Sequence, residues 1–172
     1  KSLPYDLEKD LIAVSTVAIF PDVLVAATKV PARTLSELIS YAKANEGKVN
    51  CGSAGNGTTR HLSCEMFNTL AGIKATHVPY KAGILSINAT MSGEVQMVFL
   101  NGFNATPLVN SGKLRGLGVT SLKRSRYFPA IPTLDEAGLK GYELQEFHSV
   151  VLPRGTMNER ITCSLAASHS TS

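Results

Sequence analysis

The sequence has no tryptophan, few aromatic residues and few charged ones. Aromatic side chains make up 6% and charged side chains 17% of its 172 residues. So few rings leave few platforms on which nucleic-acid bases stack. The net charge is +4, but the only dense basic cluster is the short run Lys123-Arg124-Ser125-Arg126, which is typical of a solvated turn. We therefore expect no nucleic-acid partner.

Long hydrophobic runs are also absent. No apolar segment approaches the roughly 20 residues of a membrane-spanning helix, and the first residues lack the pattern of a secretory signal peptide. The opening residues "KSLPYDLEKD" resemble the middle of a longer sequence, from which a signal could have been removed. The hydrophobic share of 44% is that of a globular protein with a core. A chain of this length forms one domain, or one and a fraction.

Cysteine is scarce, with only Cys51, Cys64 and Cys163. An odd number without a Cys-x-x-Cys motif argues against a disulfide framework, although one bridge is possible, and we expect the cysteines to be small buried apolar side chains. His61 and Cys64 are three residues apart and could supply two metal ligands. A structural zinc site needs four ligands, and no second pair is evident. The sequence predicts neither a metal nor a cofactor.

Strand-like and helix-like segments alternate from Val49 to Thr120, which is the pattern of βαβ units. We therefore predict an α/β fold with a mostly parallel sheet flanked by helices. Before this region, two strands separated by a turn at Pro21-Asp22 are expected, followed by a helix. The capping box of Thr34 and Glu37 opens that helix and Gly47 ends it.

The region after Lys123 has a different composition, with prolines and polar turns. A second capping box, Thr133 to Glu136, predicts a short helix that ends at Gly138. A strand over residues 144–153 and a helix that begins near Thr156 complete the expected elements.

The stretch "CGSAGNGTT", residues 51–59, is the most informative one. It carries three glycines and leads from a predicted strand into a predicted helix, whose first N–H groups lack backbone partners and attract anions. Neither nucleotide motif fits, because the lysine of a P-loop is missing and Arg60 occupies the position of the third glycine of a dinucleotide fingerprint. A carboxylate suits such a loop. Arg60 is expected to be either exposed or paired with an anion.

No catalytic constellation is evident in the sequence. The G-x-S-x-G and H-E-x-x-H motifs are absent. Ser40 and Lys43 match S-x-x-K, but they lie inside the helix that follows Thr34, on its predicted solvent side. A Cys64–His61 pair is the other hydrolytic alternative, although nothing in the sequence orients it.

Seven segments resemble, in the same order, the extracytoplasmic solute receptors of tripartite tricarboxylate transporters, the Bug or TctC family. The resemblance runs from about Pro4 to Thr156, and its segments include "PYDLEKDLIAVSTVA", "VPARTLSELISYAKANEGKVN", "GSAGNGTTRHLSCEMF", "AGIKATHVPYKAG" and "FPAIPTLDEAGLKGYE". It implies a periplasmic two-domain protein that closes on a small carboxylate or an amino acid, without catalysis, and delivers it to the membrane subunits of the transporter.

The resemblance also implies the site residues and the domain organisation. The glycine-rich loop of the family's first domain has no counterpart here, so the chain corresponds to the second domain with a stump of the first. We expect an incoming linker over 1–13, a ligand-binding domain over 14–142 and a return segment over 143–172. The implied ligand-binding residues are Ser53, Ala54, Gly55, Asn56, Gly57, Thr58, Arg60, Asn101 and Gly102.

Two further hypotheses concern the incomplete first domain. Homodimerisation through the return segment would cover its apolar face, "FHSVVLP". A truncated product that binds no ligand is the alternative to a working receptor. The identity of the solute does not follow from the sequence.

Overall fold

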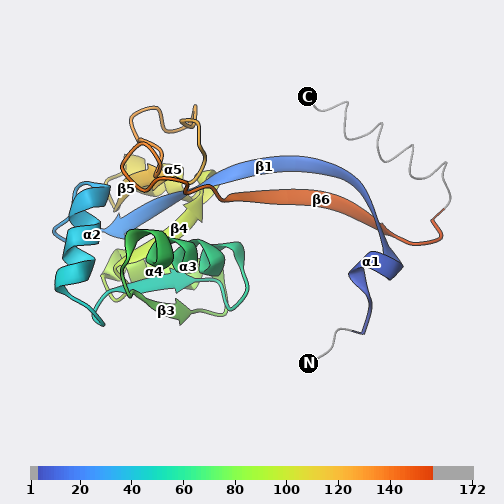
Figure 1. Cartoon of the computed structure of the whole chain (residues 1–172), viewed down its shortest axis with the longest axis horizontal. Helices are drawn as coiled ribbons and strands as arrows, with labels where there is room; N and C mark the ends of the chain where they lie inside the picture. Colours follow the sequence, from blue (N-terminus) through green and yellow to red (C-terminus); the bar gives the residue numbers. More distant parts are fainter. Residues whose placement is uncertain (1–3, 157–172) are drawn as a thin grey trace. The chain divides into compact units, whose positions relative to one another are not determined.

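The computed structural model of the protein describes residues 4–156. It divides into two compact units, which we treat separately: a central unit, Phe20–Glu146, and a terminal unit formed by Lys1–Ile19 and Phe147–Ser172. Figure 1 labels the helices and strands along the chain. The helices are α1 (Leu7–Asp10), α2 (Leu35–Ala44), α3 (Thr59–Ala71), α4 (Gly83–Ser92) and α5 (Gly102–Asn110), and the strands are β1 (Leu11–Ala27), β2 (Asn50–Ser53), β3 (Thr76–Pro79), β4 (Met97–Asn101), β5 (Leu114–Val119) and β6 (Gln145–Pro153).

The sheet has the strand order β3-β2-β4-β1-β5, and β6 pairs with β1. β2 is parallel to both β3 and β4, whereas β1 is antiparallel to its neighbours β4 and β5. Four strands, β2 to β5, therefore share one direction, with β1 inserted the opposite way. The predicted α/β fold with helices flanking a largely parallel sheet is confirmed, and β1 makes the sheet a mixed one.

The predicted break at Pro21-Asp22 is wrong, because β1 continues through both residues as a single strand. Asp22, opposite Asn101, is the first β1 residue of the ladder with β4. Pro21 lies one residue before it, so its missing N–H group removes no bond of that ladder.

The predicted helix after Thr34 is confirmed as α2. The Thr34 hydroxyl accepts from the Glu37 N–H group at 3.2 Å, and a Glu37 carboxylate oxygen accepts from the Arg33 N–H group at 2.6 Å. α2 ends at Ala44, and Gly47, with φ 77°, forms the turn that follows. Here a local hydrogen-bonding signal and an apolar face specify the same element.

The short helix predicted at Thr133 is not formed, although its capping box is. The Thr133 hydroxyl accepts from the Glu136 N–H group at 2.9 Å, and the Glu136 carboxylate accepts from the Thr133 N–H group at 3.1 Å. The turn closes at once, since Gly138 adopts φ 109° and the Leu139 N–H group bonds back to Leu134 O. A single turn remains. The helix expected after Thr156 falls on residues outside the described range.

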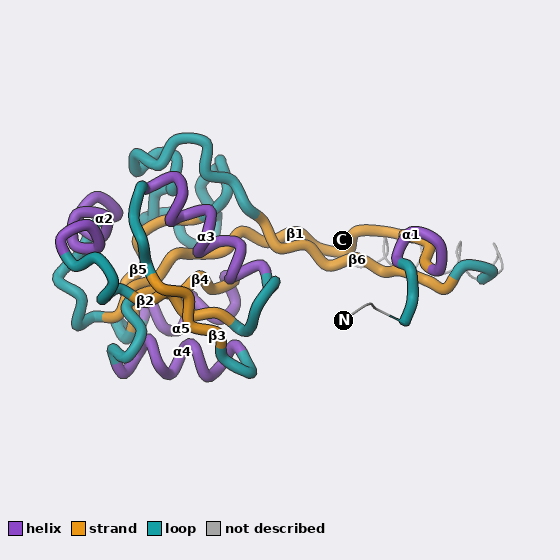
Figure 2. Tube along the Cα trace, turned by 60° about the horizontal axis from the view of Figure 1, so that its bottom comes forward, coloured by secondary structure: helices purple, strands orange, loops and turns teal. Residues whose placement is uncertain are grey.

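The core of the central unit has two parts, one on each face of the sheet. Leu24 and Ala26 of β1 point toward a cluster that contains buried residues of α2 and α3, and Val23 and Val25 point toward a cluster that contains residues of α4 and α5. Figure 2 shows these helices on the two sides of the strands. Alternate residues of β1 thus serve both layers, which is why its buried part is apolar at every position after Asp22.

In the terminal unit, α1 had not been expected within the 1–13 linker. Its first N–H groups bond to the Asp6 side chain, which accepts from Glu8 N and Lys9 N. β6 joins β1 through contacts such as the hydrogen bond between Thr16 Oγ1 and Ser149 Oγ at 3.1 Å. The strand predicted over 144–153 is confirmed as β6.

None of the helices in residues 4–156 combines the length and the hydrophobicity that crossing a bilayer requires.

Candidate functional site

The loop between β2 and α3 needs glycine at two positions. Gly55 has φ 128° and Gly57 has φ 78°, a region of backbone conformation that side chains with a Cβ rarely adopt. An added Cβ at Gly57 would meet no atom within 4 Å, so backbone conformation and not crowding requires this glycine.

The loop holds its shape through its own hydrogen bonds. Gly55 N–H donates to Ser53 Oγ at 3.0 Å, the Thr58 hydroxyl donates to Gly55 O at 2.8 Å, and Gly57 N–H donates to His61 Nδ1 at 3.0 Å. Ser53 is buried, and its Oγ also lies 2.6 Å from His77 Nε2. The hydroxyl groups of Ser53 and Thr58 are thus engaged inside the protein, which leaves backbone N–H groups to receive an anion.

Two helices begin near this loop without a side-chain cap. α3 has Thr58 and α4 has Ala82 at the N-cap, and neither side chain accepts a hydrogen bond from its helix. In contrast, Thr34 caps α2 and Asn101 caps α5. The first N–H groups of α3, those of Thr59, Arg60 and His61, have no partner within the helix, and the dipole gives this end a partial positive charge.

A cavity of about 440 Å³ lies at these two helix starts, within the size range of small-molecule sites. It is lined by Ala54, Gly57, Thr58, Thr59, Arg60, Gly83 and Glu146. The ionisable side chains of this lining are Arg60 and Glu146, which have opposite charges. A second cavity of about 490 Å³ lies beside α4 and is lined by Tyr80, Leu85, Asn88, Ala89, Ser92 and Glu94. This lining contains neither the first residue of a helix nor a cationic side chain.

Arg60 is half-buried, and its guanidinium group packs against the first residue of α4. Its Nη1 atom is buried and has no hydrogen-bond partner among the described residues. A Cβ at Gly83 would collide with that atom, so glycine at 83 makes room for the guanidinium group. Of the two expectations for Arg60, exposure or pairing with an anion, full exposure is wrong. Arg60 as a whole lines the cavity, and a guanidinium group at a cavity wall can donate to a carboxylate.

Asp22, at the start of the buried part of β1, was not predicted as a functional residue. It is 1% exposed, and both carboxylate oxygens are buried with no hydrogen-bond partner in the described part of the chain. Burial raises the pKa of Asp22 to about 7, and the charge of Glu146 adds to this, while Arg60 opposes it. A buried carboxyl group in this situation takes up either a proton or a cation.

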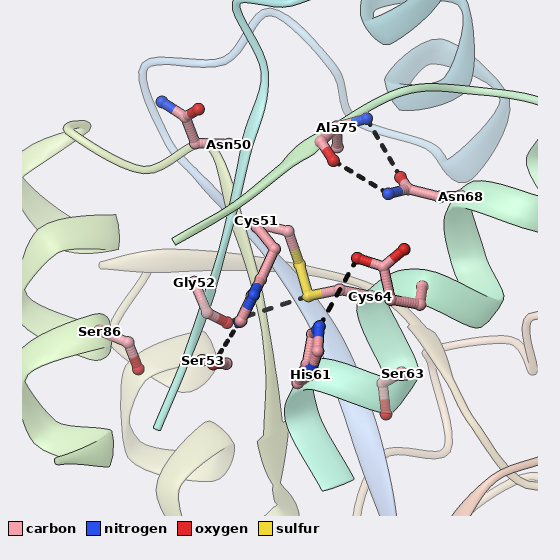
Figure 3. Close-up of a disulfide and its surroundings, with 12 residues drawn as sticks. Asn50, Cys51, Gly52, Ser53, His61, Ser63, Cys64, Asn68, Ala75 and Ser86 are labelled. Carbon is pink, nitrogen blue, oxygen red and sulfur yellow. Dashed lines mark hydrogen bonds and ion pairs between the residues drawn. A yellow bond between two sulfur atoms is a disulfide. The ribbon is translucent and has the colours of Figure 1, made fainter. Parts of the chain in front are cut away.

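A disulfide joins Cys51 of β2 to Cys64 of α3, on either side of the loop (Figure 3). The two Cα atoms are 6.2 Å apart. The expectation that the cysteines are simply small buried apolar side chains is therefore wrong for this pair. An odd number of cysteines does not show whether two of the three form a bridge. Here two of them meet because a helix packs against the strand that precedes it. Because Cys64 has no free thiol in this state, the Cys64–His61 nucleophile has no basis.

Two histidines stack beside the disulfide. The rings of His61 and His77 have centroids 3.9 Å apart and planes 18° apart, and His61 Nε2 lies 3.8 Å from Glu65 Oε1. The pKa of His77 is lowered, first by burial and second by His61, with Glu65 acting in the opposite direction. A neutral His77 can accept a hydrogen bond from the Ser53 hydroxyl, and this bond would hold Ser53 in place at the start of the loop.

The structure brings together part of the predicted ligand-binding set. Ala54, Gly57, Thr58 and Arg60 line the cavity, whereas Ser53, Gly55 and Asn56 shape the loop without lining it. Asn101 and Gly102 lie at the end of β4 and start α5, where Asn101 Oδ1 accepts from Asn104 N at 3.2 Å. The lining also includes Thr59, Gly83 and Glu146, which had not been predicted. Of these three residues, only Thr59 lies in the glycine-rich stretch 51–59 that the sequence analysis singled out.

The remaining sequence candidates do not form a site. Ser40 and Lys43 are exposed on α2, as expected for its solvent side. Within residues 4–156, no group of three or more histidine, cysteine, aspartate or glutamate side chains could hold a metal ion.

Comparison with known proteins gives a family match over the whole chain. Residues 1–172 match the family described as the tripartite tricarboxylate transporter family receptor. The chain spans about half the length of the curated relatives it matches, 52% and 46% of two of them.

Three solved structures are similar over nearly the whole chain. Rpa4515 of R. palustris, described with adipate, has 34% identity and a TM-score of 0.91 over 98% of this chain and 56% of its own. MatC of Rhodopseudomonas palustris, described with bound malate, has 30% identity and a TM-score of 0.87 over 99% and 58%. The periplasmic binding protein BugD has 30% identity and a TM-score of 0.84 over 92% and 52%.

Proposed function

The chain belongs to the receptor family of tripartite tricarboxylate transporters, and on that premise we propose that its central unit is the half of a solute receptor that captures a small carboxylate. The ligand lies in the cavity at the starts of α3 and α4. Its carboxylate accepts hydrogen bonds from the first N–H groups of α3 and from Arg60.

One observation carries this proposal: two uncapped helix starts and the positively charged side chain of Arg60 meet at one cavity. Each feature alone has a structural explanation. Together they supply N–H donors, a partial positive charge and a full positive charge at one place. The similarity to Rpa4515 and MatC, described with adipate and malate, supports a carboxylate as the ligand.

The proposed setting is the periplasm, with membrane subunits of a tripartite transporter as partners and no catalysis by this chain. The similarity to the periplasmic protein BugD supports this compartment. So does the Cys51–Cys64 disulfide, because disulfides form and persist in oxidising compartments.

We further propose that the domain organisation predicted from the sequence holds: a linker over 1–13, a ligand-binding domain over 14–142 and a return segment over 143–172. The return segment then belongs to the first domain of the receptor fold. The Asn101 and Gly102 loop of the predicted set then faces the cleft between the two domains.

The test is a panel of mono-, di- and aminocarboxylates, scored by thermal denaturation and by NMR titration of the full chain. A ligand that prefers the folded state raises the unfolding temperature. Arg60→Gln should weaken binding, and more at low salt than at high salt, because screening reduces the contribution of a partly exposed charge.

Arg126→Gln provides the matched control, since Arg126 is exposed and does not line the cavity. If no carboxylate shifts the unfolding temperature or the amide signals of α3, the proposed function is wrong and a chain without ligand-binding activity is the better account.

A further inference from the structure

A buried carboxyl group, that of Asp22, lies near the cavity without lining it. Asp22 is 1% exposed, and both of its side-chain oxygens lack a hydrogen-bond partner within residues 4–156. Its backbone, in contrast, is fixed by Thr120: the Asp22 N–H group donates to Thr120 Oγ1 at 2.8 Å, and Asp22 O accepts from Thr120 N at 2.9 Å. The sheet thus holds Asp22 in place, and the charges around it decide whether its carboxyl group is ionised.

The groups that act on Asp22 come from β6, α3 and the segment before β6. The pKa of Asp22 is raised to about 7, first by burial and second by Glu146 of β6, while Arg60 of α3 lowers it. Tyr142, in the segment before β6, is also within electrostatic reach of Asp22. Burial raises the pKa of Tyr142, whose hydroxyl donates to Ser63 O at 2.9 Å, so Tyr142 stays neutral around pH 7.

Arg60 connects this buried carboxyl group to the cavity. Its charge favours the ionised form of Asp22, and the same side chain lines the cavity at the starts of α3 and α4. A carboxylate that binds at Arg60 adds a negative charge to the surroundings of Asp22 and cancels part of the attraction that Arg60 exerts. The ionised form of Asp22 then becomes less favourable, and its carboxylate takes up a proton from the solvent.

We propose that ligand capture in this cavity is coupled to proton uptake by Asp22. Asp22 does not touch the ligand; the arriving carboxylate and an ionised Asp22 compete for the same guanidinium charge. Because coupling between two binding events is reciprocal, protonation of Asp22 strengthens carboxylate binding by the same factor. The cavity therefore holds its ligand more tightly in mildly acidic than in mildly alkaline surroundings. This inference rests on the proposed function and adds its regulation by pH.

The first measurement is the affinity of the full chain for butyrate at pH 6 and pH 8, at equal ionic strength. Butyrate is ionised at both pH values, so only the protein titrates. Binding is followed by NMR from the methyl signal of Ala54, which lines the cavity and does not exchange with solvent. We expect binding to be about fivefold tighter at pH 6, the ratio that follows if bound butyrate raises the pKa of Asp22 from about 7 to about 8.

The second measurement counts the protons directly. Butyrate is titrated calorimetrically at pH 7.5 in Tris and in triethanolamine, two cationic buffers that differ in ionisation enthalpy and do not compete for an anion site. The difference in heat between the buffers gives the number of protons taken up per butyrate bound. With the same two pKa values, we expect an uptake of about half a proton.

Asp22→Asn removes the titrating group and keeps its size. This variant should bind butyrate at pH 8 as tightly as the parent chain binds it at pH 6, without proton uptake. A gain of affinity is a result that damage to the fold does not produce. Glu143→Gln is the matched control and should keep the pH dependence of the parent chain, because Glu143 is exposed and does not line the cavity. Arg60→Gln should weaken binding and reduce the proton uptake, since the coupling passes through its charge.

The outcomes separate this inference from the proposed function. Equal butyrate affinity at the two pH values in the parent chain overturns the coupling while carboxylate binding stands. A pH dependence that persists in Asp22→Asn also overturns it and points instead to His61 and His77 beside the loop. If butyrate binds at neither pH, the coupling is again refuted, and the wider carboxylate panel decides separately whether the proposed function stands.

Discussion

Asp22 makes the stability of the folded chain depend on pH in an unusual direction. The unfolded carboxyl group titrates near its ordinary value of 3.8, and burial raises the folded pKa to about 7. Between these values the folded state holds more protons than the unfolded one, so the free energy of unfolding falls as pH rises through this window. The full effect is on the order of 4 kcal/mol, since one pKa unit corresponds to about 1.4 kcal/mol.

We therefore expect Asp22→Asn to be more stable than the parent chain at pH 8 and nearly equal to it near pH 3, below both pKa values of Asp22, as measured by urea denaturation. Asp135→Asn is the control, because the pKa of the Asp135 carboxyl group is lowered, mainly by its bond from Gly141 N–H. Asp135→Asn should lose stability only at pH values above the acid range, where the Asp135 carboxyl group is ionised in the folded protein. Equal stability gains at both pH values for Asp22→Asn would contradict the assignment.

Gly83 controls the position of Arg60. Gly83→Ala adds a Cβ that collides with the Arg60 guanidinium group, the mobile end of a long side chain. The side chain can move aside, and glycine inside a helix is less favourable than alanine by only about 0.5–1 kcal/mol, so stability should change little while carboxylate binding weakens several-fold. In an Arg60→Ala background the same substitution should have no effect on binding, and a double-mutant cycle measured by NMR titration tests this.

At the scale of elements, the Cys51–Cys64 disulfide ties β2 to α3 with a sequence separation of 13. Cross-linking a loop of this size stabilises a fold by about 3 kcal/mol in the chain-entropy account. Cys51→Ser should therefore lower the unfolding temperature, and a reductant should lower that of the parent chain but not that of the variant. Cys163→Ser, which leaves the bridge intact, is the control. A reductant-sensitive unfolding temperature in Cys51→Ser would point to another pairing.

The order of elements from α2 to β5 could be predicted from sequence because each carries a local signal. Thr34 with Glu37, and the glycines at 72 and 93, mark helix ends by their own backbone chemistry. Signals failed where their effect depended on distant residues. Pro21 ends no strand because of where the β4 ladder starts, and the Thr133 box opens no helix because Gly138 closes the turn.

The site was predictable only in its contiguous part. The loop from Ser53 to Thr58 could be recognised in the sequence because its glycines and hydrogen-bond donors follow one another along the chain. Glu146, Gly83 and Asp22 come from three other segments and meet the loop only through the fold, so no spacing in the sequence relates them to it.

At the scale of the whole molecule, the terminal unit exposes large apolar side chains. Phe147 is 67% exposed, and Val17, Ile19 and Val151 are also exposed on β1 and β6. Exposed apolar strands favour association, so homodimerisation through this unit remains our proposal.

Phe147→Lys should shift the chain toward a monomer in light scattering at high concentration. Phe103→Lys in the central unit, where Phe103 is 90% exposed, should leave the oligomeric state unchanged. A parent chain that is monomeric across the concentration range would refute the dimer.

The uncapped starts of α3 and α4 also determine which helical amide protons exchange fastest with solvent. Amide protons without an acceptor exchange with solvent quickly, so those of Thr59 and Arg60 should exchange far faster in the empty protein than those deeper in α3. A bound carboxylate becomes their acceptor and should slow this exchange. The capped starts of α2 and α5 should be indifferent to ligand. The first turn of α3 thus completes its hydrogen bonding only when the cavity is filled, and a deuterium-exchange time course would follow that ordering amide by amide.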